Sequence, residues 1–143
     1  MTKPVPTMTS LFLDTAYAIA LSAPTDAYHQ RALALADQLE ETPTRLVTTR
    51  AVLIEIGNAL SKPRYRRAAV ALLDALEADP RVEIVPLTDA LYLEALQLFR
   101  ARPDKKWGLT DCISFIVMRE RGITDALTTD EDFEQAGFRA LLR

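Results

Sequence analysis

The sequence is poor in the residues that build soft-metal sites and histidine-based catalysis. Among its 143 residues it has one cysteine, Cys112, and one histidine, His29. One cysteine excludes an internal disulfide and cysteine-rich zinc sites, and one histidine excludes paired-histidine acid–base catalysis. Cys112 is interpreted as a small buried filler and His29 as a surface or core-edge residue. Any metal ion bound by this chain is therefore expected to have oxygen ligands.

The sequence also lacks a membrane segment and a surplus of positive charge. No apolar run approaches the ~20 residues of a membrane span. Residues 11–23 imitate a secretory segment, but Asp14 interrupts them, so we expect a cytoplasmic protein with no membrane partner. The chain has 20 Asp and Glu against 17 Lys and Arg. This balance argues against the global basic field of a dedicated nucleic-acid binder.

Strand and helix signals alternate along the chain. Length and composition predict a single domain at residues 10–143 after a flexible lead-in at residues 1–9. The alternation predicts an α/β fold, a three-layer α/β/α sandwich around a central, mostly parallel sheet. The predicted strands are 10–14, 45–48, 82–87 and 123–128, with an edge strand at 138–142, and the predicted helices are 17–21, 26–41, 49–60, 64–78, 88–101, 110–121 and 130–136.

Four acidic side chains are predicted to meet at the carboxyl edge of this sheet, where open α/β sheets bind ligands. Asp14 ends the first strand, and Asp130 follows the last clear strand. Glu55 lies on the apolar, inward stripe of its helix, and Asp111 lies in the first turn of a nearly all-apolar helix. Hard divalent cations require several oxygen ligands, so this set predicts a metal site.

Each of these acids also has a purely structural interpretation. Asp14 and Asp130 would be helix N-caps, because each directly precedes a predicted helix. Asp111 would complement a helix dipole, and Glu55 would be paired with Arg50.

The order and spacing of these acids and their neighbours resemble those of the PIN-domain nucleases, in particular the VapC-like toxins of bacterial toxin–antitoxin pairs. The similarity covers nearly the whole chain and is carried by residues 13–15, 55–60, 107–115 and 126–133. It implies Mg²⁺ or Mn²⁺ bound for cleavage of single-stranded RNA. By position, the implied catalytic metal ligands are Asp14, Glu55, Asp111 and Asp130, with Asp132 as a further candidate and Thr128 or Thr129 as the hydroxyl beside them.

The resemblance also implies products and partners. The RNA fragments would carry 5′-phosphate and 3′-hydroxyl ends. A homodimer and a small antitoxin protein, one segment of which fills the active-site groove, would be the protein partners. Two features depart from the family: the net charge is -3 where many such nucleases have a basic face, and Gly57 stands where many relatives have a larger residue.

Two basic clusters are the predicted phosphate contacts of an RNA substrate. Tyr65 or Trp107 would stack on an unpaired base. The alternative is that both clusters are solvated loops and that Trp107 belongs to the core. The candidate RNA-binding residues are Lys62, Arg64, Arg66, Arg67, Lys105 and Lys106.

The leading hypothesis is therefore a divalent-metal endoribonuclease. A second is a catalytically idle PIN-like module for RNA binding or assembly, which is disfavoured because the acidic set is complete. A third is a phosphohydrolase with an aspartyl nucleophile at Asp14. That chemistry needs a second aspartate two residues later, where this chain has Ala16.

Overall fold

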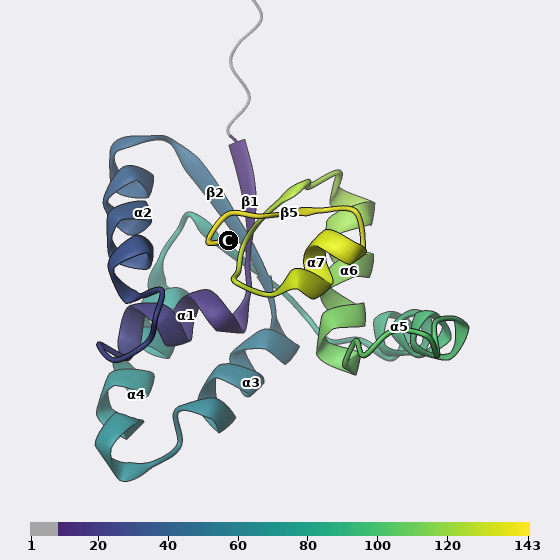
Figure 1. The fold of residues 1–143 in the computed structure, drawn as a ribbon, viewed down its shortest axis with the longest axis horizontal. Coiled ribbons are helices and arrows are strands. Elements are labelled where there is room, and N and C mark those ends of the chain that lie inside the picture. Colours follow the sequence, from purple (N-terminus) through teal and green to yellow (C-terminus); the bar gives the residue numbers. More distant parts are fainter. Residues whose placement is uncertain (1–8) are drawn as a thin grey trace, which may run out of the picture.

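Five parallel strands form the central sheet of a computed structural model that describes residues 9–143. Their order across the sheet is β3-β2-β1-β4-β5, and every neighbouring pair is parallel (Figure 1). The predicted α/β sandwich is thus confirmed, and the sheet is wholly parallel. The strands are β1 (Thr9–Leu13), β2 (Thr44–Thr49), β3 (Val82–Val85), β4 (Asp125–Leu127) and β5 (Arg139–Ala140).

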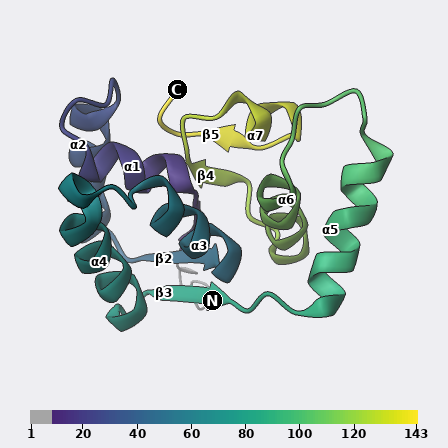
Figure 2. The same cartoon turned by 90° about the horizontal axis from the view of Figure 1, so that it is seen from below.

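Seven helices within the described residues cover the two faces of the sheet. The chain runs from β1 to β2 to β3 in one direction and then returns past β1 to β4 and β5. Right-handed crossovers therefore put α1–α4 on one face and α5–α7 on the other, as the separated groups in Figure 2 show. The helices are α1 (Thr15–Ser22), α2 (His29–Glu41), α3 (Arg50–Ala59), α4 (Pro63–Ala78), α5 (Asp89–Ala101), α6 (Leu109–Arg121) and α7 (Glu131–Gln135).

The direction of the chain reverses at β1, which lies between β2 and β4. Phe12 and Leu13 of β1 pair with Ala126 and Leu127 of β4, and the Asp14 N–H donates to the Leu127 carbonyl at 3.3 Å. Such a switch point opens a crevice beyond the carboxyl ends of the two strands. The residues that follow β1 and β4 therefore begin at the same place.

Aromatic packing ties α6 and α7 to each other. Phe115 of α6 and Phe133 of α7 are fully buried and meet edge to face, with ring centroids 5.0 Å apart. Trp107 is also buried, meets Phe115 edge to face with ring centroids 5.1 Å apart, and donates its indole N–H to Gln135 Oε1. This burial confirms that Trp107 belongs to the core. The prediction that its ring stacks on an RNA base is therefore wrong.

The observed helix boundaries follow local hydrogen bonds. Thr88 accepts from the Leu91 N–H and caps α5, as predicted, and Gly122 ends α6 in the left-handed conformation. The predicted start of a helix at residue 26 is wrong, because α2 begins at His29. The Asp26 carboxylate accepts the Tyr28 N–H, which forms a turn before the helix.

The last three of the five strands along the chain are shorter than predicted. β3 ends before Pro86, which has no N–H for a sheet ladder, and β4 comprises residues 125–127. Residues 1–8 of the predicted lead-in lie outside the described residues, and Thr9 begins β1. Within residues 9–143, no helix is both long enough and apolar enough to span a membrane.

Gly122 and Gly57 differ in whether their backbone conformation requires a glycine, which an alanine substitution at each position can test. Gly122 has φ of 65°, whereas Gly57 lies inside α3, where an added Cβ would make an ordinary contact at 3.9 Å from Leu73 Cδ1. We expect Gly122→Ala to lower the free energy of unfolding by about 1 kcal/mol and Gly57→Ala to raise it by about 0.5 kcal/mol. Urea denaturation measures both changes. Changes of the same sign in the free energy of unfolding would contradict the view that only Gly122 needs the conformational freedom of glycine.

Candidate metal centre

Asp14 and Thr128 join the ends of β1 and β4. Asp14 is buried, and its Oδ2 accepts a hydrogen bond from Thr128 Oγ1 at 2.7 Å. The same hydroxyl accepts from the Asp130 N–H at 3.1 Å. Asp14 occupies the N-cap position of α1, as its structural interpretation predicted, but its side chain makes no capping bond to the helix. Of the two candidate threonines, Thr128 is the one that bonds to an acid of the site.

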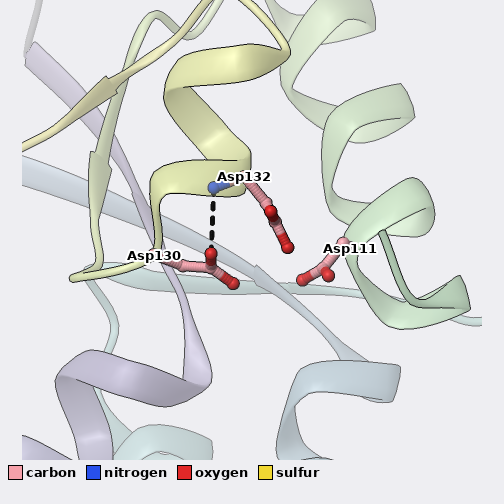
Figure 3. Close-up of side chains that lie close together, drawn as sticks. All are labelled: Asp111, Asp130 and Asp132. Carbon is pink, nitrogen blue, oxygen red and sulfur yellow. Dashed lines mark hydrogen bonds between the residues drawn. The ribbon is translucent and has the colours of Figure 1, made fainter. Parts of the chain in front are cut away.

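Asp130 and Asp132 stand at the start of α7. Asp130 Oδ1 accepts the Asp132 N–H at 2.9 Å and so caps the helix, as its structural interpretation predicted. Asp132 is buried, and its Oδ1 accepts from Lys106 Nζ at 2.9 Å. The N-cap bond turns the Asp130 side chain toward that of Asp132 (Figure 3).

Asp111 approaches these two residues from the first turn of α6. Its Oδ2 accepts the Gly108 N–H at 3.0 Å, a bond that holds the beginning of the helix. Each of Asp111, Asp130 and Asp132 offers one oxygen atom, and these three atoms lie within 4.8 Å of one another. Figure 3 shows the three side chains pointing into the space between α6 and α7.

The donor set of this cluster fits a hard divalent cation. All three groups are carboxylates, and each has one oxygen in a hydrogen bond and one without such a bond in the described part of the chain. At Asp111 and Asp130 the donor is a backbone N–H, which fixes the carboxylate and leaves its other oxygen for an ion. Asp132, the fifth candidate from the sequence, belongs to this cluster together with Asp111 and Asp130.

Asp14 and Glu55 complete the negative field around the cluster. Burial raises the pKa of Asp14 to about 7, and the charges of Asp111 and Glu55 also raise it, against the lowering effect of the Thr128 hydrogen bond. Burial likewise raises the pKa of Asp111 to about 6, with further increases from Asp130, Asp132 and Glu55. The charges of these five acids, which are Asp14, Glu55, Asp111, Asp130 and Asp132, therefore act on one another. This concentration of negative charge favours a divalent cation.

The structural explanation for Glu55 does not hold. Arg50, its proposed partner, forms an ion pair with Glu77 of α4. Glu55 is half-buried, and no ion pair involves it within residues 9–143. A role for Glu55 in a metal site stays a prediction, because the observed carboxylate cluster comprises Asp111, Asp130 and Asp132.

The two basic clusters have different surroundings. Lys106 bonds to the acidic site, whereas the cluster at the start of α4 makes no ion pair with the site acids in the described part of the chain. Arg66 donates twice to the Ser61 carbonyl, and the Arg64 guanidinium lies 4.7 Å from the centroid of the Tyr65 ring. RNA binding by either cluster stays a prediction.

The lone cysteine and histidine lie outside the acidic cluster. Cys112 is fully buried, and burial raises the pKa of its thiol to about 11, so the filler interpretation is confirmed. His29 is half-buried, and its Nδ1 lies 2.7 Å from the Ala20 carbonyl oxygen.

Residues 11–139 of this chain, which include the strands of the parallel sheet and all the acids described above, match the PIN domain family. The chain belongs to this family, and the resemblance is confirmed. It is 32% identical over 128 residues to the 23S rRNA-specific endonuclease VapC20 of Mycobacterium tuberculosis, a match that covers 90% of this chain and 95% of that protein.

Comparison with solved structures gives the same similarity to VapC20. The crystal structure of M. tuberculosis VapC20, described as a sarcin-ricin loop cleaving toxin, superposes with a TM-score of 0.80 at 31% identity and covers 90% of this chain and 95% of that one. VapBC2 from Rickettsia felis, bound to a promoter DNA fragment, gives a TM-score of 0.63 at 15% identity, with coverage of 92% and 97%. FitAcB from Neisseria gonorrhoeae gives a TM-score of 0.61 at 19% identity and covers 91% of this chain and 94% of that one. The last two show likeness of fold alone.

Neutralising Asp14 should stabilise the protein without metal. Because its folded-state pKa of about 7 exceeds the ordinary 3.8, the folded state holds a proton that the unfolded state releases. This contribution to stability is present below pH 4 and is lost as pH rises toward 7. In EDTA at pH 7.5 we expect Asp14→Asn to raise the free energy of unfolding by roughly 1–3 kcal/mol, measured by urea denaturation.

The matched control for this experiment is Asp37→Asn, on the exposed side of α2. It should leave the free energy of unfolding within about 0.5 kcal/mol of the original protein at both pH 5 and pH 7.5. A loss of stability for Asp14→Asn at pH 7.5 would show that the buried carboxylate is not the source of strain.

Proposed function

We propose that this protein is a divalent-metal-dependent endoribonuclease that hydrolyses phosphodiester bonds of single-stranded RNA, as the toxin of a toxin–antitoxin pair. The observation that carries the proposal is the convergence of Asp111, Asp130 and Asp132 within 4.8 Å at the sheet edge. Its support is the 32% identity, over 90% of the chain, to a 23S rRNA-specific endonuclease. Ribosomal RNA is therefore the first substrate class to test.

Asp111, Asp130 and Asp132 would hold Mg²⁺ or Mn²⁺, with Asp14 and Glu55 completing the site. A bound ion of this kind lowers the pKa of a coordinated water and stabilises negative charge on the departing oxygen. Thr128 donates its hydroxyl to Asp14 Oδ2 and would thereby orient this carboxylate. Because the attacking water needs no imidazole base in such chemistry, the reaction is compatible with a chain whose only histidine is a structural residue of α2.

Phosphate binding would come from the basic residues near this edge. Lys105 and Lys106 precede α6, which carries Asp111, and Lys62, Arg64, Arg66 and Arg67 follow the helix that carries Glu55. The products would carry 5′-phosphate and 3′-hydroxyl ends. The proposed protein partners are a second copy of the chain and a small antitoxin, the latter supported by the toxin–antitoxin complexes that share the fold.

Cleavage of an RNA pool that contains ribosomal RNA tests the proposal. We expect cleavage with Mg²⁺ or Mn²⁺, none with EDTA, and a loss of about 100-fold or more in Asp14→Asn, Asp111→Asn and Asp132→Asn. Product ends are measured by ligation and phosphatase treatment. Asp37→Asn serves as the control and should retain full activity.

Two results would count against this mechanism. Cleavage that survives EDTA and the aspartate substitutions would exclude a role for the cluster. RNA binding without cleavage under either metal would favour the alternative, an idle PIN-like module for RNA binding or assembly.

The basic start of α4 is tested by removing two exposed charges. We expect Arg64→Gln combined with Arg67→Gln to weaken RNA binding by about fivefold or more and to reduce its salt dependence, because fewer counterions are released. Fluorescence anisotropy at several salt concentrations measures both effects. Arg100→Gln combined with Arg119→Gln, which removes two exposed charges on α5 and α6, is the control. An equal loss in both pairs would indicate general electrostatics only.

A further inference from the structure

Lys106 places an exposed ammonium group on a buried carboxylate of the acidic cluster. Its Nζ lies 2.9 Å from Asp132 Oδ1 and 3.9 Å from Glu131 Oε1. The Lys106 side chain is 66% exposed, whereas that of Asp132 is 5% exposed. The lysine is therefore the member of this pair that can move into water without disturbing the core.

The three carboxylates of the cluster differ in the nature of their hydrogen-bond donors. Asp111 is held by the Gly108 N–H and Asp130 by the Asp132 N–H, both of which belong to the backbone of helix starts. Asp132 is held by a side chain at the end of a flexible stem. The two backbone donors are therefore fixed by the fold, whereas the Lys106 ammonium can move away from Asp132 by rotation of its side chain.

We propose that Lys106 is a displaceable counter-cation of the acidic cluster, which neutralises Asp132 before a divalent ion binds and competes with that ion for the carboxylate. The inference rests on the proposed function, because the ion is the metal of the nuclease. A positive charge a few ångströms from a divalent cation opposes its binding, and an exposed ammonium regains full hydration when it leaves.

This competition reconciles two roles of one side chain. Lys106 is a predicted contact of RNA phosphate, and the structure pairs it with Asp132. Once the ion has taken its place on Asp132, the ammonium is free to contact the phosphate group of the substrate. Metal binding and RNA binding would then favour each other through Lys106.

Isothermal titration calorimetry of Mg²⁺ and Mn²⁺ binding to the full chain tests the inference. We expect Lys106→Met to bind either ion about tenfold more tightly than the original protein. Lys105→Met is the matched control, because it removes the same charge one residue away and Lys105 makes no ion pair within residues 9–143. Its metal affinity should change by about twofold or less, as expected for a screened charge.

Thermal unfolding provides a second readout. In EDTA, Lys106→Met should unfold at a lower temperature than the original protein because Asp132 has lost its cation, and added Mg²⁺ should raise its Tm by more than it raises that of the original protein. Lys106→Gln should behave in the same way.

Each outcome has a definite meaning. Equal or weaker metal binding by both Lys106 variants would overturn the inference and make Lys106 a fixed orienting donor, while the proposed function would stand. Absence of any metal binding by the original protein would overturn the inference and the proposed metal mechanism together.

Discussion

The repulsion among carboxylates held at one sheet edge is the constraint that the structure has to satisfy. Buried acids are costly without donors or cations. Thr128 supplies a donor to Asp14, the backbone supplies donors to Asp111 and Asp130, and Lys106 supplies an ammonium to Asp132. Each of these bonds engages one oxygen of its carboxylate. Burial, with a smaller contribution from the neighbouring negative charges, raises the pKa of Asp14 and of Asp111.

The same hydrogen bonds show that a structural role and a ligand role need not be alternatives. Asp130 caps α7 and Asp111 secures the start of α6, each with a single oxygen. A carboxylate has two oxygens, so a capping residue retains one for a cation. Only Asp14 lacks the capping bond that its position predicted, because its carboxylate turns to Thr128 of the neighbouring strand end.

Much of the fold could be predicted from local patterns, because hydrophobic periodicity and capping residues act over a few positions. The predicted helix start at residue 88 and the predicted helix end at residue 121 agree with the structure to within one residue, whereas the predicted start at residue 26 was wrong because Asp26 forms a competing turn. The rule that parallel strands end at one edge indicated correctly that Asp14 and Asp130 share that edge. The closeness of Asp132 to Asp111 could not be predicted in this way, because it depends on how Phe115 and Phe133 pack α6 against α7.

The sequence by itself determined the alternation of strands and helices, the all-oxygen character of any metal site and membership of the PIN domain family, because composition, periodicity and motif order are properties of the chain. Only the tertiary structure decided that Thr128 and not Thr129 bonds to Asp14, that Trp107 lies in the core, and that Lys106 meets Asp132. These are contacts between distant segments, and their geometry is set by strand register and side-chain packing, which no local pattern encodes.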